Sequence, residues 1–276
     1  MKRRLAIGDI HATDRQLRTL WDWVAPTSRD LVVFLGDYVD RGPNSNAVLG
    51  FLIELHAESD GQVRFLLGNH ERMMMDARHD ARMRQMWLMS GGAETMASYG
   101  MRCISELSNE SWVDLVPEAH WHFLEENCEL FIDDGDILFV HAGLDPDLEL
   151  ADQRERDLLW RRHHGGPLHT CGKRVICGHN EQRSHYPLIS EGFIIADTFA
   201  YGDGPLTCIS IDEQLAHQQF ACGRRRSLTW SSDFELHEVP SAADSGKANK
   251  SPSNERHSTT TGLASLWSES TDSSGS

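Results

Sequence analysis

Six short apolar runs in this chain each lead into polar side chains that can bind a metal ion or a phosphate. The runs cover residues 5–7, 31–35, 63–67, 137–140, 175–177 and 193–196, and the polar groups after them include Asp9, His11, Asp37, Asn69, His70, His141, His179 and Asp197. Short runs rich in β-branched residues and bounded by glycine are typical of buried strands. Residues 14–24 and 44–58 carry apolar side chains at three- and four-residue spacing, which predicts helices. Alternating strands and helices predict an α/β sheet whose polar strand ends form the site.

These strand ends offer carboxylate, amide and imidazole groups together. Asp9 and His11 are two residues apart at the end of a run, so their side chains are expected on one face. Such a ligand set suits Mn²⁺, Fe or Zn²⁺ better than Ca²⁺ alone. Six ligands are too many for one tetrahedral ion and suit two ions that share a bridging carboxylate. Any one of these groups alone would be read as a helix cap or a satisfied polar group.

The composition excludes several classes of protein. Lys and Arg number 26 against 42 Asp and Glu, a formal charge of -16, which argues against a nucleic-acid binder. No apolar run approaches the roughly 20 residues of a membrane span. The first run ends at Gly8-Asp9, too early for a signal peptide, and the cysteines form no CxxC pair. We therefore expect a soluble, cytoplasmic enzyme, monomeric by default, with no nucleic-acid or membrane partner.

The composition also changes along the chain. From Arg224 onward the apolar periodicity fades, and residues 241–276 are mostly polar. We expect a folded catalytic domain over residues 1–223 and a polar, disordered tail over 224–276. Residues 72–123 are interpreted as a mainly helical insertion over the site.

Five sequence blocks then resemble a known family. They are Gly8-Asp9-Ile10-His11, Gly36-Asp37-Tyr38-Val39-Asp40-Arg41-Gly42, Gly68-Asn69-His70-Glu71, His141-Ala142-Gly143 and Gly178-His179. Their order is similar to that in calcineurin-like metallophosphoesterases, and in particular to the phosphoprotein phosphatases of bacterial and bacteriophage type. The resemblance spans about residues 4–212. It implies a four-layer β-sandwich flanked by helices, with two metal ions at the sheet edge.

The resemblance also implies a role for each ligand position. Asp9 and His11 would bind the first metal ion, and Asp37 would bridge the two ions. The second ion would be bound by Asn69, His141 and His179.

The same resemblance implies the catalytic groups. Hydroxide bridging the two ions would attack phosphorus in line with the leaving oxygen, and His70 would protonate the leaving alkoxide. Asp40 would orient His70, and Arg41 would bind the phosphoryl oxygens together with a second arginine. Arg162 is the candidate for that second arginine, with Arg161 as the fallback. Substrate contacts are expected from Arg41, Asn69, Arg162 and Tyr201, although core packing is an equal alternative for Tyr201.

Two enzymatic functions fit these motifs. The first is removal of phosphate from phosphoserine and phosphothreonine in proteins. The second is hydrolysis of symmetrical dinucleoside polyphosphates such as diadenosine tetraphosphate by a sister group with the same dimetal site. Asp40-Arg41 favours the first function, because the sister group tends to have Ala-Arg at these two positions. Glu71 also favours it, because the sister group tends to have Asp at this position. A non-catalytic phosphate-binding protein would require a lost ligand or a lost acid, and neither is missing.

The chain departs from the family pattern at three positions. Ala12 and Phe199 stand where glycine is usual or frequent, and Asn180 stands where threonine is usual. None of these changes removes a ligand or a proton donor. A further stretch, Ser90-Gly91-Gly92-Ala93-Glu94-Thr95, resembles a loop-and-helix element of bacterial members and is expected to form a wall of the cleft.

Overall fold

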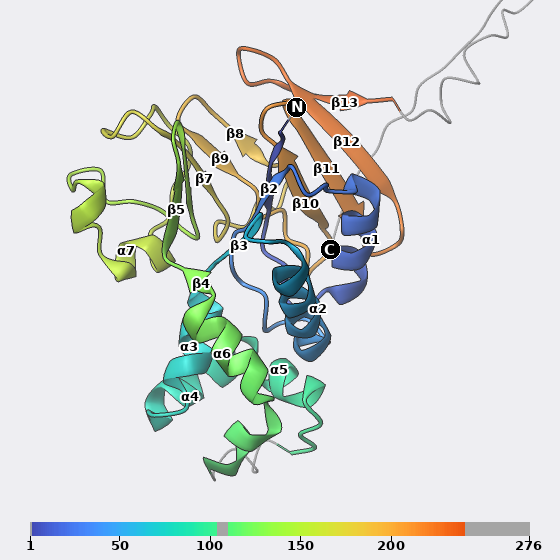
Figure 1. Cartoon of the computed structure of the whole chain (residues 1–276), viewed down its shortest axis with the longest axis vertical. Coiled ribbons are helices and arrows are strands. Elements are labelled where there is room, and N and C mark those ends of the chain that lie inside the picture. The colour runs from blue at the N-terminus through green and yellow to red at the C-terminus, as the bar shows by residue number, and fades with distance from the viewer. Residues whose placement is uncertain (1, 104–109, 241–276) are drawn as a thin grey trace, which may run out of the picture. The chain divides into compact units, whose positions relative to one another are not determined.

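Two mixed β-sheets form the frame of the computed structural model, which describes residues 2–103 and 110–240 (Figure 1). The eight-stranded sheet has the order β13-β12-β11-β10-β1-β2-β3-β4, and the five-stranded sheet has the order β5-β6-β7-β9-β8. The strands of the first sheet are β1 (Arg4–Ile7), β2 (Leu31–Phe34), β3 (Val63–Leu66), β4 (Cys128–Glu129), β10 (Pro205–Ser210), β11 (Leu215–Phe220), β12 (Arg225–Trp230) and β13 (Leu236–Val239). Those of the second are β5 (Phe131–Asp134), β6 (Ile137–Val140), β7 (Arg174–Cys177), β8 (Leu188–Ile189) and β9 (Phe193–Ile195).

Helices flank both sheets. They are α1 (Asp14–Val24), α2 (Ser45–Glu58), α3 (Asn69–Asp76), α4 (Ala81–Trp87), α5 (Ala93–Ser98), α6 (Glu118–Glu126) and α7 (Glu155–Trp160). A π-helical turn, Leu88–Gly92, joins α4 to α5, and short 3-10 turns lie at Glu110–Leu115 and Leu150–Asp152.

The strand side chains alternate between different layers of the core. On β1, Leu5 and Ile7 belong to the cluster under the helices, whereas Ala6 faces the second sheet. On β6, Phe139 packs between the sheets, and Leu138 packs on the outer face with Leu158 of α7. Because successive strand side chains point to opposite faces, such alternation requires both faces of a sheet to be covered. The predicted four-layer sandwich is therefore confirmed.

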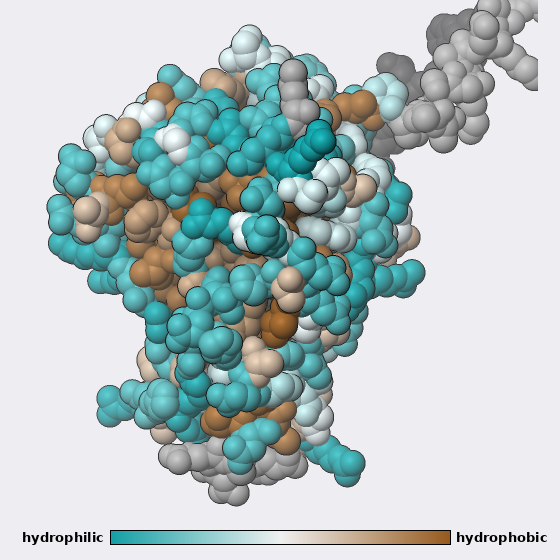
Figure 2. Space-filling view, viewed as in Figure 1, coloured by the Kyte–Doolittle hydropathy of each residue, from teal (hydrophilic) through white to brown (hydrophobic). Residues whose placement is uncertain are grey.

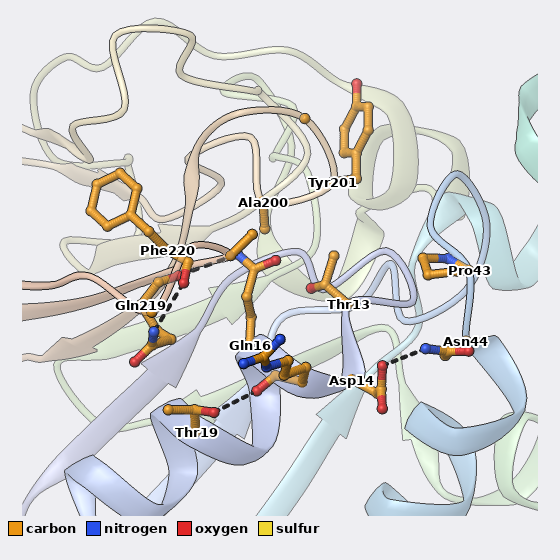
Figure 3. Close-up of a pocket in the computed structure, with 14 residues that line it drawn as sticks. Thr13, Asp14, Gln16, Thr19, Pro43, Asn44, Ala200, Tyr201, Gln219 and Phe220 are labelled. Carbon is orange, nitrogen blue, oxygen red and sulfur yellow. Dashed lines mark hydrogen bonds between the residues drawn. The ribbon is translucent and has the colours of Figure 1, made fainter.

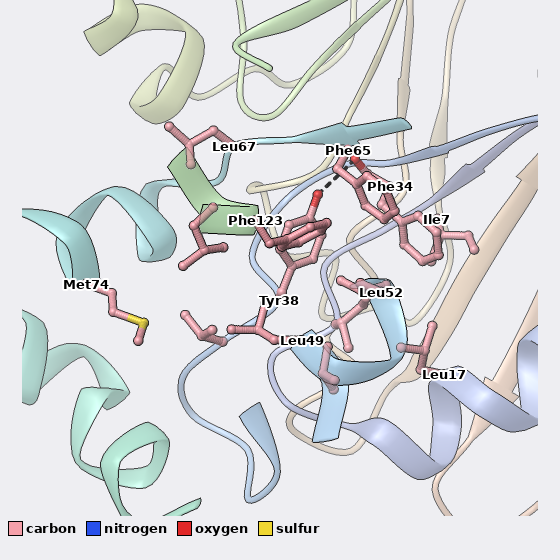
Figure 4. Packing of buried hydrophobic residues seen from close by; sticks show 14 of the residues in the cluster. Ile7, Leu17, Phe34, Tyr38, Leu49, Leu52, Phe65, Leu67, Met74 and Phe123 are labelled. Carbon is pink, nitrogen blue, oxygen red and sulfur yellow. Dashed lines mark hydrogen bonds between the residues drawn. The ribbon is translucent and has the colours of Figure 1, made fainter. Parts of the chain in front are cut away.

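Aliphatic and aromatic side chains together fill the layer between the first sheet and the helices (Figure 4). The rings of Phe34 and Phe65, on neighbouring strands, stack with their centroids 5.3 Å apart. Tyr38, just beyond β2, is buried in the same cluster, and its hydroxyl donates to the carbonyl of Leu66 at 2.6 Å. This packing fixes the start of the loop that follows β2.

Parallel pairing brings the predicted ligand-bearing loops to one edge. β1, β2 and β3 pair in parallel in the first sheet, as do β6, β7 and β9 in the second. The carboxyl ends of parallel strands lie at the same edge, so the polar residues after these six strands are collected there. The six predicted strands are confirmed to within one residue at each end, and the helix over 14–24 is confirmed.

The predicted end of the folded domain at residue 223 is wrong. β12 pairs with β11, β13 pairs with β12, and both strands belong to the same structural unit as the described residues before them. Leu228 and Trp230 of β12 are buried in the layer between the sheets. The polar composition after Arg224 hid a strand in which buried side chains alternate with more exposed ones. The part of the predicted tail over 241–276 lies outside the described residues.

The segment 72–123 contributes most of α3, all of α4 and α5, and the first part of α6. Its residues 104–109 lie outside the described part of the chain. Among the residues that the structure describes, no helix combines the length and apolar character needed to cross a membrane. The face shown in Figure 2 is largely hydrophilic, with apolar side chains in separate groups.

Leu228→Ala tests the corrected boundary. The side chain is 1% exposed, so its truncation is expected to lower the free energy of unfolding by about 2–5 kcal/mol. Denaturant unfolding of the two proteins measures this difference. Val239→Ala on exposed β13 is the control and should change stability by no more than about 0.5 kcal/mol. A loss as small as the control's would contradict the packing of β12 between the sheets.

Candidate dimetal active site

The loops at the sheet edge have unusual backbone conformations. Five predicted site residues have positive φ: His11 (43°), Asp37 (52°), Asp40 (71°), Arg41 (66°) and His179 (61°). Such conformations cost about 1–3 kcal/mol each for residues other than glycine, and they persist only where surrounding contacts enforce them. Ala12 and Phe199 also have positive φ, 58° and 68°, which explains why glycine suits these two positions in the family pattern.

Glu71 supplies much of that enforcement. Its buried carboxylate accepts the backbone N–H groups of Asp37 (2.9 Å), Tyr38 (2.8 Å), Val39 (3.1 Å) and Gly68 (3.0 Å). Burial and the nearby charge of Asp37 raise the pKa of Glu71, and these four donors oppose the rise by stabilising the carboxylate. Sequence reasoning used Glu71 only to separate two families and missed this role. Its position three residues after the N-cap of α3 is a recognisable capping signal.

Two histidines present unprotonated nitrogens to the site. His11 Nδ1 donates to the carbonyl of Val39 at 2.9 Å, and His141 Nδ1 donates to that of Leu35 at 2.7 Å. Because a carbonyl only accepts, the proton of each neutral ring lies on Nδ1, and Nε2 carries the lone pair. Burial lowers the pKa of both imidazoles, which keeps them neutral and able to bind a cation.

Asp37 lies between two groups of possible metal ligands. One group is His11, Asp37 and His70, the other is Asp37, His141 and His179, and the ligand atoms of each lie within 4.8 Å of one another. Asp37 Oδ2 is 3.5 Å from His11 Nε2, and Oδ1 is 3.4 Å from His141 Nε2. Burial alone would raise the pKa of Asp37, but the surrounding histidines lower it below its usual range. Asp37 is thus the one residue common to both groups, and its role as a bridging ligand stays a prediction.

Asn69 completes the second group. Its side-chain oxygen lies 2.8 Å from His141 Nε2 and 3.0 Å from His179 Nδ1. Burial, with the neighbouring His141, lowers the pKa of His179 to about 3. The acceptor atoms of Asp37, Asn69 and His141 therefore converge without a proton between them, and a cation is the partner that such convergent acceptors need. The residues fit two metal ions, which Asp37 would bridge.

Asp9 is placed differently from the other predicted ligands. It belongs to neither group of ligands, and its carboxylate accepts the backbone N–H of His179 at 3.0 Å. Burial and the charges of Asp197 and Asp37 raise its pKa. Asp9 thus lies beside the cluster, and its role as a ligand stays a prediction.

His70 and Asp40 form a buried pair. His70 Nδ1 donates to Asp40 Oδ2 at 2.7 Å, as the predicted orienting role requires. Burial opposes the charged form of His70, but Asp37 and Asp40 outweigh it and raise the His70 pKa. Trp87 and Thr95 also donate to Asp40, and sequence reasoning did not anticipate either contact.

The predicted substrate residues line one cleft of about 680 Å³. Its walls include Arg41, Asn69, His70, Arg162, His179 and Tyr201, together with apolar side chains such as Met89 and Trp160. Arg41 Nη1 donates to His11 Nε2 at 3.1 Å, and its guanidinium lies 4.5 Å from the centre of the Tyr201 ring. The fallback Arg161 pairs instead with Asp157 at 3.0 Å, which favours Arg162 as the second phosphate arginine.

A second cavity, of about 440 Å³, shares Tyr201 with this cleft (Figure 3). It is lined by α1, the loop before α2 and the β11–β12 turn, with Thr13, Gln16, Asn44 and Phe220 among its residues. Within it, Asn44 donates to Asp14 at 2.7 Å. The hydroxyl of Tyr201 donates to Glu181 at 2.5 Å.

This arrangement agrees with comparisons to known families. Residues 2–198 match the calcineurin-like phosphoesterase family, and the chain therefore belongs to that family of metallophosphoesterases. It is a hydrolase of the phosphoesterase superfamily.

Curated relatives of two kinds match parts of the chain. A symmetrical bis(5′-nucleosyl)-tetraphosphatase from Paracidovorax citrulli is 44% identical over 141 residues, which cover 51% of this chain and 44% of that protein. Serine/threonine-protein phosphatase 1 from Salmonella typhimurium is 37% identical over 87 residues, covering 31% of this chain and 37% of that protein. The matches thus span less than half the length of these relatives.

Solved structures share the fold. A serine/threonine phosphatase from Saccharomyces cerevisiae matches with a TM-score of 0.52 at 17% identity, covering 86% of this chain and 79% of that one. A cold-active protein-tyrosine phosphatase from a psychrophilic Shewanella also gives 0.52, at 16% identity and with coverages of 82% and 80%.

Asp37→Asn tests the shared ligand. Because Asp37 is the member common to both groups, its loss should lower the bound Mn²⁺ from two ions per chain to one or fewer. Elemental analysis after equilibration with Mn²⁺ and gel filtration measures the stoichiometry. Asp40→Asn, which alters a carboxylate outside both groups, should retain two ions. Two ions on the Asp37 variant would contradict a bridging position.

Proposed function

We propose that the protein removes phosphate from phosphoserine and phosphothreonine residues of proteins, with two divalent cations in the site. Mn²⁺ is the favoured metal, and Fe or Zn²⁺ are alternatives that the same ligands accept. The observation that carries the proposal is the buried His70–Asp40 pair, with His70 on the wall of the cleft.

The leaving group explains why this pair matters. Serine or threonine leaves as an alkoxide, a strong base that departs only when it is protonated, so a positioned acid gives a large gain in rate. A nucleoside diphosphate is a stable anion at neutral pH and leaves without a proton. Asp40, which orients the imidazole, therefore favours a phosphomonoester of an alcohol over a dinucleoside polyphosphate.

The other residues have complementary tasks. When bound, the two cations lower the pKa of a water molecule and neutralise phosphoryl oxygens. Arg41 and Arg162 would bind the remaining phosphoryl oxygens, and the planar guanidinium suits that geometry. Asn69 would contribute a further polar contact, and Tyr201 supports Arg41 through its ring. Apolar Met89 and Trp160 at the cleft would accept the side chains beside a phosphorylated residue.

One observation favours a second function. The tetraphosphatase relative matches half of the chain at 44% identity, so symmetrical hydrolysis of diadenosine tetraphosphate is the alternative activity. The Salmonella protein phosphatase supports the first function. Both activities would use the same ligands.

A comparison of the two substrates tests the proposal. A phosphoserine peptide and diadenosine tetraphosphate are supplied side by side to protein stripped of metal and to the same protein with Mn²⁺ restored. We expect metal-dependent phosphate release, with a higher kcat/KM for the peptide. A higher kcat/KM for the dinucleotide would overturn the proposed substrate and establish the alternative.

His70→Asn tests the proposed acid. We expect kcat for the phosphoserine peptide to fall about 10²–10⁴-fold, the usual contribution of general acid catalysis, and kcat for p-nitrophenyl phosphate to fall much less. The aryl oxide is a weak base and leaves readily without a proton. His120→Asn is a matched control, because His120 is also a buried histidine but pairs with Tyr99 in the insertion. Equal losses on both substrates would rule out His70 as the acid.

A further inference from the structure

The helical insertion reaches the buried carboxylate of Asp40. Besides His70, Asp40 accepts the indole N–H of Trp87, which lies 3.0 and 2.9 Å from its two oxygens, and the hydroxyl of Thr95 at 2.6 Å. Trp87 ends α4 and Thr95 lies in α5. Asp40, Trp87 and Thr95 are all fully buried, with exposed fractions of 0%. If either donor were removed, no water molecule could reach Asp40 to replace its hydrogen bond, so the loss would cost free energy.

The direction of the Thr95 hydrogen bond is defined by its neighbours. Thr95 Oγ1 accepts the backbone N–H of Asp40 at 2.9 Å and lies 2.9 Å from the hydroxyl of Ser45. Because the Asp40 carboxylate only accepts, the single proton of the Thr95 hydroxyl is directed to Asp40 Oδ1, and the Ser45 hydroxyl donates to Thr95. Thr95 holds the backbone and the side chain of Asp40 at once.

Two glycines allow the insertion to come this close. Gly91 accepts the backbone N–H of Arg41 at 3.3 Å and has φ of 114°, and a Cβ there would lie 2.5 Å from the Arg41 nitrogen. A Cβ on Gly92 would lie 2.5 Å from the indole of Trp87. The Ser90–Thr95 motif therefore does more than form a wall of the cleft, because its glycines permit contacts with Arg41 and Trp87.

We propose that Trp87 and Thr95 are positioning residues for the general acid. They hold the Asp40 carboxylate in the orientation that directs His70 Nε2 toward the cleft. The inference rests on the role of His70 in the proposed function. A carboxylate bonded to His70 alone could rotate within its pocket, and the imidazole would turn with it. A misplacement of about 1 Å can cost on the order of 10²-fold in rate.

The leaving group again provides a readout. Thr95→Val keeps the shape of the side chain and removes the hydroxyl. We expect kcat for glycerol 2-phosphate, an alkyl ester, to fall about 10-fold or more with little change in KM, and kcat for p-nitrophenyl phosphate to fall less than 3-fold. Thr95→Ser restores the hydroxyl and should restore most of the alkyl ester activity.

A matched control separates positioning from a general effect on folding. Thr207 of β10 is also fully buried, and its hydroxyl bonds to Gln218 at 2.9 Å. Thr207→Val should leave the ratio of alkyl to aryl activity unchanged. If Thr95→Val does not fold, Trp87→Phe removes the other donor while keeping an aromatic ring, and the same ratio is measured.

The decisive comparison uses a protein that lacks the acid. In a His70→Asn background, Thr95→Val should cause less than a 2-fold further loss on the alkyl ester, because Thr95 acts through His70. A further loss as large as in the wild-type background would overturn the inference, as would equal losses on the two esters. The wild-type protein's preference between phosphopeptide and dinucleotide is a separate result, so the proposed substrate and this inference can fail independently.

Discussion

The site depends on the carboxylate of Glu71, which accepts four backbone N–H groups from the loops after β2 and β3. One buried side chain thereby joins the loop that carries Asp37 to the turn that carries Asn69. The interaction is strong because a carboxylate with several amide donors replaces most of its lost hydration. Together with the backbone N–H groups of Ile10 and His11, which donate to the Asp37 carbonyl, it offsets the cost of the positive φ of Asp37.

The second constraint is the topology of the sheets. Parallel pairing collects the polar residues at one edge of each sheet, and the packing of the two sheets against each other brings Asp37 Oδ1 of one to 3.4 Å from His141 Nε2 of the other. The aromatic stack under β2 and β3 anchors these strands from the other side. The packed layers therefore determine the positions of the predicted ligands, and the loops that carry them can be short.

Much of this was predictable from the sequence. The predicted ligands directly follow short runs rich in β-branched residues. Because such runs predict buried parallel strands, whose carboxyl ends lie at one edge of a sheet, the sequence places Asp37, Asn69, His141 and His179 at strand ends. Strand β12 was missed because Arg225, Ser227 and Thr229 mask the alternation of its buried side chains. The contacts of Asp40 with Trp87 and Thr95 span 47 and 55 residues, and no local pattern encodes them.

The placement of these contacts divides the site into two structurally separate parts. The predicted metal ligands lie in the turns that directly follow strands, whereas two of the three side-chain donors to Asp40, Trp87 and Thr95, lie in the helical segment 72–123. Exchange of that segment alone would alter how protons are delivered without disturbing the ligand cluster. Proteins with the same metal ligands could in this way differ in the leaving groups that they protonate, while the chemistry of the metal ions stays the same.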